Sequence, residues 1–135
     1  MSDKTATIFA DGGSRGNPGP AGAGAVIKEN DGVVAELARF IGNSTNNVAE
    51  YTSLIMGLEK ALDLGYECVE VRMDSELVVK QMNGQYRVKN EKLKPLFQEA
   101  RTLVARFRQA KITHVRREYN KEADRLANKA MDEGA

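Results

Sequence analysis

The order of the apolar segments constrains the fold of this chain most strongly. Three segments with the composition of β-strands come first, and helical and strand-like patterns alternate after them. We predict strands over Lys4–Asp11, Ala21–Lys28 and Val33–Ile41, with a loop over Gly12–Pro20. Asn30-Asp31-Gly32 predicts a tight hairpin, so the second and third strands should run antiparallel.

The second half of the chain favours an α/β fold. A meander followed by helix–strand units predicts a five-stranded mixed sheet, with three antiparallel strands, then parallel strands, and helices on both faces. The first and fourth strands should therefore run parallel. The first predicted helix begins at a cap formed by Ser44, Thr45 or Asn46 and ends at about Leu64. The other predicted helices run from Ser75 to Met82, along the apolar stripe from Leu93 to Phe107, and from about Asn120 onward. The two remaining predicted strands are Cys68–Met73 and Lys111–Val115.

Length and composition indicate one globular domain over residues 1–135. A chain of 135 residues can bury a core without disulfides, and its single cysteine, Cys68, is interpreted as a buried apolar residue. No segment approaches the roughly 20 apolar residues of a membrane span, and none resembles a signal peptide. We therefore expect a cytoplasmic protein with no membrane partner. The net charge of +1 leaves any phosphate binding to the local placement of charge.

Four acidic residues lie at the edges of predicted core elements. Asp11 and Asp74 each end an apolar strand, and if these parallel strands are neighbours, both carboxylates lie at the carboxyl edge of the sheet, where ligands bind. Glu50 lies in the first turns of its helix, and Asp124 borders the apolar face of the last helix. Turn, helix-dipole or surface chemistry explains each acid alone. The four together favour a shared site.

A cluster of carboxylates suits divalent-cation chemistry. Mg²⁺ prefers carboxylate oxygens and water, and two such ions about 4 Å apart can promote phosphodiester hydrolysis. The sequence has no Cys/His set with zinc spacing and no Walker-type phosphate loop. Its only histidine, His114, lies in a predicted strand and is interpreted as structural, so a Ser/His/Asp site is not indicated.

Four segments, in order, resemble the motifs of type 1 ribonuclease H. The first two are quite specific and the last two are weak alone, but together they span nearly the whole chain. The resemblance implies a ribonuclease H-like fold and an endonuclease that hydrolyses the RNA strand of RNA–DNA hybrids by two-metal-ion catalysis, leaving 5′-phosphate and 3′-hydroxyl ends. The segments are Asp11-Gly-Gly-Ser-Arg-Gly-Asn-Pro-Gly-Pro, Ser44-Thr-Asn-Asn-Val-Ala-Glu50-Tyr, Asp74-Ser-Glu-Leu-Val and Asn120-Lys-Glu-Ala-Asp124-Arg-Leu-Ala.

The resemblance also assigns roles to residues. It implies that the four acids hold two Mg²⁺ ions, with Mn²⁺ as an alternative. Asn17 and Thr45 match positions that hold a phosphate of the DNA strand, while Asn46 and Asn47 match contacts to the hybrid. Amide side chains can contact base edges and sugars in the minor groove, where the 2′-hydroxyl distinguishes RNA from DNA. Turn and cap chemistry is the alternative role for these polar residues. The implied metal ligands are Asp11, Glu50, Asp74 and Asp124.

The chain departs from the family pattern in a loop before the last helix. Many members have a catalytic histidine there, whereas this chain has the short segment Arg116–Tyr119, and His114 comes earlier. Arg117, or less favourably Arg116, could take over the role of this histidine by assisting the departure of product or metal. Because a guanidinium does not release its proton near neutral pH, that role would be electrostatic. A surface basic pair or a simple phosphate contact is an equal alternative.

Two further departures concern the substrate. Glu76 stands where a glutamine often follows the third motif, so one contact to the RNA strand should be altered. The segment Asn83–Lys94 is too short for the basic protrusion of some members, which makes this a short form of the family. A modest basic set remains there, which is either a substrate contact or a solvated surface: Arg87, Lys89, Lys92 and Lys94.

Two other functions remain as alternatives. A non-catalytic nucleic-acid-binding module would gain nothing from four clustered acids. A junction resolvase or proofreading exonuclease would share the fold, but the proofreading type requires an acid where Gly13 stands. The expected partner is an RNA–DNA hybrid, with duplex RNA left open as a second substrate, and a monomer is expected.

Overall fold

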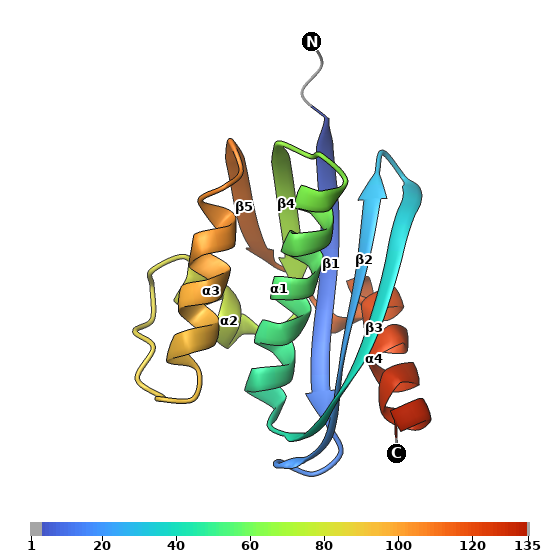
Figure 1. The fold of residues 1–135 in the computed structure, drawn as a ribbon, viewed down its shortest axis with the longest axis vertical. Helices are drawn as coiled ribbons and strands as arrows, with labels where there is room; N and C mark the ends of the chain where they lie inside the picture. Colours follow the sequence, from blue (N-terminus) through green and yellow to red (C-terminus); the bar gives the residue numbers. More distant parts are fainter. Residues whose placement is uncertain (1–3, 135) are drawn as a thin grey trace.

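The computed structural model describes residues 4–134 and contains a five-stranded sheet in the order β3-β2-β1-β4-β5 (Figure 1). The second and third strands of the meander lie on one side of β1, and the two strands from the helix–strand units lie on the other side. The elements are β1 (Thr5–Ser14), β2 (Gly19–Glu29), β3 (Gly32–Ser44), α1 (Asn46–Asp63), β4 (Cys68–Met73), α2 (Glu76–Met82), α3 (Lys94–Val104), β5 (Gln109–His114), the 3₁₀ turn η1 (Arg117–Tyr119) and α4 (Lys121–Gly134).

The strand directions confirm the predicted mixed sheet. Pairing is antiparallel between β1 and β2 and between β2 and β3. It is parallel between β1 and β4 and between β4 and β5. The predicted hairpin is present between β2 and β3, where Asn30 has φ 51°. Asparagine tolerates this left-handed conformation better than most residues, which explains the turn.

Helices cover both faces of the sheet, as predicted. Helices α1 and α3 lie in front of the strands in Figure 1, and α4 lies behind β2 and β3. The contacts agree with this view, because Gly57 of α1 lies against Ile8 and Ala25, which belong to paired strands and point to the same face of the sheet. Within residues 4–134, no helix is long and apolar enough to cross a membrane. The largest fully buried apolar side chains of the core are Tyr51, Ile8, Ile27, Leu54, Leu58, Met73, Val26, Val71 and Val78.

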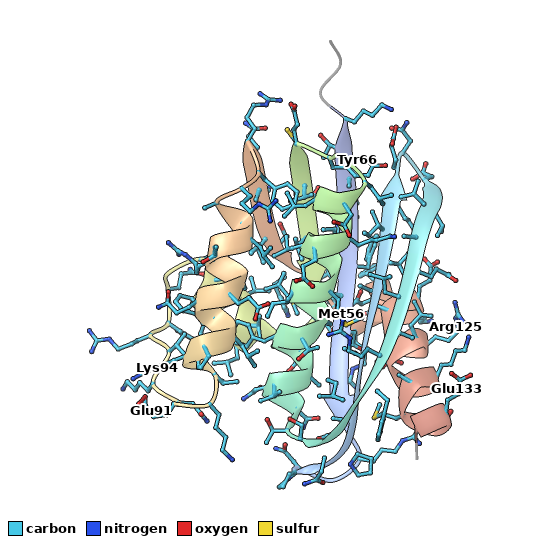
Figure 2. All side chains as sticks on the ribbon, in the orientation of Figure 1. Met56, Tyr66, Glu91, Lys94, Arg125 and Glu133 are labelled. Carbon is cyan, nitrogen blue, oxygen red and sulfur yellow. The ribbon has the colours of Figure 1, made fainter. Side chains whose placement is uncertain are left out.

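Local signals placed both ends of α1 and the start of α2 correctly, whereas the helix predicted over Leu93 to Phe107 is shorter in the structure, where α3 spans Lys94–Val104. The Thr45 hydroxyl accepts a hydrogen bond from the Val48 amide at 3.3 Å and caps α1. Ser75 caps α2 in the same way. Gly65 follows the end of α1 with φ 87°, a conformation that favours glycine. Just beyond it, Tyr66 donates a hydrogen bond of 2.6 Å to Glu29 and joins this end of α1 to β2 (Figure 2).

Several predicted strand boundaries are wrong. Gly12 and Gly13 do not end β1, because they pair with Ala23 and Gly22 and the strand continues to Ser14. The third strand extends beyond its predicted end at Ile41, because the pairing of β3 with β2 continues to Ser44. The fifth strand begins earlier than predicted, and the short loop after it contains η1. The observed strands are β1 (Thr5–Ser14), β2 (Gly19–Glu29), β3 (Gly32–Ser44) and β5 (Gln109–His114).

Gly12 has a packing role that a strand-breaker interpretation overlooks. A Cβ atom at this position would lie 2.3 Å from the carbonyl oxygen of Ala49 and 2.6 Å from the amide nitrogen of Glu50. Real side chains do not approach backbone atoms this closely, so only glycine allows the first turns of α1 to rest on β1. The missing side chain therefore sets the position of Glu50.

We expect Gly12→Ala to lower the free energy of unfolding by about 1–3 kcal/mol, because the added methyl group must push the α1 backbone away from β1. Urea denaturation checks this. Gly32→Ala is the matched control, because its Cβ would meet only Glu29 O at an ordinary 3.6 Å. Equal unfolding midpoints for the two variants would contradict the proposed close packing.

Candidate active site

The four predicted acids line one cleft of about 490 Å³: Asp11, Glu50, Asp74 and Asp124. The cleft lies where β1 and β4 end their pairing, and its walls come from β1, the first turns of α1, the side of α4 between Asp124 and Met131, and the segments after β1, β4 and β5. Two arginines, Arg15 and Arg117, also line it. With all groups ionised, four carboxylates and two guanidinium groups leave a formal excess of two negative charges.

The parallel pairing of β1 and β4 places two of the acids together. The last paired residues are Ala10 and Met73, so Asp11 and Asp74 follow at the same level of neighbouring strands. This is the arrangement that the two apolar segments predicted. It depends on β1 and β4 being direct neighbours, which the sheet order confirms.

The other two acids arrive from opposite faces of the sheet. Glu50 comes from α1, which rests on Gly12. On the other face, Gly24 pairs with Asp11, and a Cβ atom at position 24 would lie 2.4 Å from the carbonyl oxygen of Ala123. The absence of that side chain lets α4 approach β2, which brings Asp124 beside Asp11.

Burial and neighbouring acids strongly perturb Asp11. Removal of the carboxyl from water is the main cause, and the charge of Asp74 and a hydrogen bond with Asp124 add to it, raising the pKa of Asp11 from 3.8 to about 9. With no cation to balance the charge, the protonated form of Asp11 is therefore favoured at neutral pH.

The pKa of Glu50 is raised less than that of Asp11, because Glu50 has partners that stabilise its ionised form. Burial raises the pKa of Glu50 from 4.5 to about 7, while a hydrogen bond from Ser75 and the charge of Arg117 oppose the increase. Ser75 thus has two roles, since the same hydroxyl caps α2 and reaches Glu50. The sequence indicated only the cap.

Asn120 holds Asp74 in place. Its Nδ2 donates hydrogen bonds of 2.9 Å to Asp74 Oδ1 and to the carbonyl oxygen of Ala10, and its side chain is only 1% exposed. A flipped amide would direct its oxygen at two other oxygens, so this orientation is fixed by chemistry. Asn120 therefore joins the start of α4 to both strands that carry the aspartates.

Sequence reasoning missed Asn120 as a site residue. It was assigned only to the beginning of the last helix. The available signal was its place as the first residue of the fourth motif, one helical turn before Asp124.

The arginine segment lies beside the cleft. Arg117 Nε lies 3.7 Å from Asp74 Oδ2, and the Arg117 side chain is 86% exposed. Arg116 and His114 are exposed and are not among the residues that line the cleft. The structure thus favours Arg117 over Arg116 as the neighbour of the acids, while its role in catalysis stays a prediction.

The predicted substrate contacts form a network at the entrance. Asn17 Oδ1 accepts a hydrogen bond of 3.0 Å from the Asn46 amide, and Asn46 Oδ1 accepts bonds from the Ser14 amide and hydroxyl. Asn46 and Asn47 line the cleft, whereas Asn17 and Thr45 lie outside its lining. Turn and cap chemistry therefore accounts for part of what these residues do.

Glu76 and the modest basic set lie away from the acids. Glu76 pairs with Lys80 at 3.6 Å on the exposed side of α2 and does not line the cleft. The basic set lies on the segment before α3 and at its start, where Figure 2 shows Lys94 extending beside Glu91. Contact of these residues with a substrate stays a prediction.

The donor set fits a hard divalent cation. All four acids contribute carboxylate oxygens to one cleft with a negative excess, which is the ligand chemistry that Mg²⁺ prefers. Within residues 4–134, no three acidic, histidine or cysteine side chains are yet close enough to enclose an ion. Binding of an ion by three or more of these acids would therefore require their carboxylates to move closer together.

Comparison with known proteins shows relatives that match nearly all of this chain. A family model described as reverse transcriptase-like matches residues 9–130. Bifunctional protein Rv2228c of Mycobacterium tuberculosis is 52% identical over 130 residues, which cover 95% of this chain and 36% of that protein. Ribonuclease HI of Halobacterium salinarum is 47% identical over 126 residues, which cover 93% of this chain and 63% of that protein. The chain thus spans less than two thirds of each of these relatives.

Solved structures share the fold closely. RNase H1 from Halobacterium salinarum has a TM-score of 0.92 at 45% identity, covering 96% of this chain and 98% of that one. LC11-RNase H1, isolated from compost, was solved in complex with an RNA/DNA hybrid; it has a TM-score of 0.90 at 43% identity, with the same coverage. The similarity therefore extends well beyond the motif segments.

The perturbed pKa of Asp11 predicts how stability depends on pH. Between pH 4 and pH 9 the folded carboxyl retains a proton that the unfolded chain releases, so stability in EDTA should fall as pH rises through this range. Asp11→Asn removes this proton linkage and should stabilise the protein at pH 8 by about 1–2 kcal/mol. Thermal unfolding from pH 5 to pH 9 measures both effects. Asp31→Asn, in the exposed hairpin, is the control, and parallel pH profiles for all three proteins would refute the prediction.

Loss of Asn120 should affect both stability and activity. Asn120→Ala leaves the buried Ala10 carbonyl without its donor, which should cost about 1–3 kcal/mol, and releases Asp74, which should lower activity roughly 10–100-fold. The control is Asn83→Ala, because Asn83 donates to the Ile112 carbonyl at 3.0 Å outside the cleft. If the two variants have equal activity, Asn120 does not position Asp74.

Proposed function

Because this chain belongs to the type 1 ribonuclease H family, we propose that it is an endonuclease that hydrolyses the RNA strand of RNA–DNA hybrids and leaves 5′-phosphate and 3′-hydroxyl ends. The observation that carries the proposal is the convergence of four carboxylates on one cleft from four separate elements. A hybrid-bound relative, LC11-RNase H1, supports the choice of substrate.

Asp11, Glu50, Asp74 and Asp124 would hold the divalent cations, with Mg²⁺ as the expected metal and Mn²⁺ as an alternative. Two bound cations would supply the positive charge that activates a water molecule and stabilises the leaving oxygen. The protein contributes orientation. Asn120 fixes Oδ1 of Asp74, while Oδ2 lies within ion-pair distance of Arg117, and Ser75 restrains Glu50.

The entrance of the cleft would bind the hybrid. Asn46 and Asn47 line the cleft, where their amides can reach sugars and base edges of the minor groove. The Thr45 hydroxyl oxygen accepts a hydrogen bond from the Val48 amide, so the hydroxyl group can still donate its own hydrogen to a phosphate. Asn17 lies beside them, and the N-terminus of α1 adds its favourable dipole. These contacts would keep the RNA strand over the acids.

Arg117 would act through its charge. Its ion pair with Asp74 is long, and its side chain is exposed, so it can move between that carboxylate and a phosphate of the product. Such exchange would assist the departure of product or metal without any proton transfer. Since one chain supplies all four acids, a monomer suffices for the reaction.

We expect Asp74→Asn to abolish Mg²⁺-dependent cleavage and to leave the fold intact. The amide keeps the Oδ1 that Asn120 contacts but removes the negative charge. Labelled RNA–DNA hybrid, duplex RNA and duplex DNA are incubated with Mg²⁺, Mn²⁺ or EDTA, and circular dichroism monitors folding. Asp63→Asn, an exposed acid at the far end of α1, should retain activity.

The same assay separates the alternatives. Cleavage of duplex DNA would favour a different nuclease of this fold, and binding without cleavage under every metal would favour a binding module. Full activity of Asp74→Asn would rule out the assigned acids. Cleavage of duplex RNA would extend the substrate range.

A further inference from the structure

Arg15 combines a place in the acidic cleft with a partner outside it. It lies in the turn between β1 and β2 and lines the cleft, but its Nη2 forms an ion pair of 2.6 Å with Asp132 Oδ1 near the end of α4. The Arg15 and Asp132 side chains are 46% and 65% exposed. Exposed ion pairs contribute little to stability, so Arg15 can exchange this partner readily.

The backbone that carries Arg15 is held firmly. The Arg15 amide donates to the Pro20 carbonyl at 2.8 Å. On either side of it, Ser14 and Asn17 both bond to Asn46 at the start of α1. The side chain can therefore change partner while its point of attachment stays fixed.

The charges of the cleft give Arg15 a potential role toward a polyanion. Arg15 and Arg117 are the two cations among the residues described as lining the cleft, and Arg117 faces Asp74. Asp132 lies eight residues after Asp124 on α4, which corresponds to about 12 Å along the helix. Arg15 is therefore displaced along the cleft from the acids, where a bound strand would continue. Figure 1 shows the β1–β2 turn and the last turn of α4 at the same end of the molecule.

We propose that Arg15 binds a backbone phosphate of the nucleic acid and that Asp132 competes with this phosphate for the guanidinium group. A guanidinium binds phosphate through paired, charge-assisted hydrogen bonds, so the exchange favours a correctly seated strand. Asp132 lowers the affinity for any polyanion that does not reach Arg15 in the right register. This inference rests on the proposed function, because it assumes that the hybrid lies in the cleft.

Binding measurements test the phosphate contact. Fluorescence anisotropy with labelled RNA–DNA hybrid is performed in the Asp74→Asn background with Mg²⁺, at salt concentrations from about 50 to 200 mM. Arg15→Ala should weaken binding several-fold and should reduce the slope of log affinity against log salt by about 1. Arg15→Lys should restore the slope but only part of the affinity, because it retains the charge without the paired geometry.

A double-mutant cycle tests the competition. The control for Asp132→Asn is Glu133→Gln, which removes the same charge at the neighbouring position near the end of α4 (Figure 2). Asp132→Asn should strengthen hybrid binding several-fold more than this control does. In the Arg15→Ala background, Asp132→Asn and Glu133→Gln should have equal effects, because no guanidinium is left to release.

The outcomes separate this inference from the proposed function. If the Asp74→Asn protein binds the hybrid but Arg15→Ala changes neither affinity nor salt slope, the phosphate contact is wrong and the proposed function stands. If Asp132→Asn has the same excess effect with and without Arg15, the competition is wrong. If no variant binds the hybrid, the proposed function fails and this inference fails with it.

Discussion

The close approach of two helices to opposite faces of the sheet is the constraint on which the site depends. Helix α1 rests on Gly12, and α4 rests on Gly24, at positions where any Cβ atom would collide with helix backbone. Because Gly24 is the pairing partner of Asp11, both approaches occur at the same level of the sheet. Acids from two faces can therefore meet at one edge. Packing this close concentrates negative charge, so the geometry that serves function opposes stability.

The four acids are not equivalent, because their partners differ. Asp74 has a buried amide donor and a guanidinium group within ion-pair distance. Glu50 has a hydroxyl donor, whereas the causes that shift the pKa of Asp11 are burial and other acids. Asp11 is therefore the group that gains most from a bound cation. Hydrogen bonds from Asn120 and Ser75 restrain Asp74 and Glu50, whereas Asp11 has, among the described residues, no such neutral donor or cationic partner to stabilise its ionised form.

Sequence patterns predicted the elements that depend on local chemistry. The hairpin at Asn30, the caps at Thr45 and Ser75 and the aspartates at the ends of paired strands all follow from neighbours in the chain. Gly12 was misinterpreted because the sequence alone does not distinguish a glycine that ends a strand from a glycine that lets a helix pack closely on the strand. The same limit applies to Asn120, whose partners lie 46 and 110 positions away. Long-range contacts such as these are absent from any local pattern.

The charge of the cleft links cation binding to substrate binding. With all groups ionised, four carboxylates and two arginines leave an excess of two negative charges, which repels a nucleic acid. One divalent cation would cancel that excess, and two would reverse its sign. Each ligand would then promote binding of the other by the same free energy, since such coupling is reciprocal. A net charge of +1 is consequently no obstacle to binding a polyanion, because the attraction is created in the cleft rather than spread over the surface.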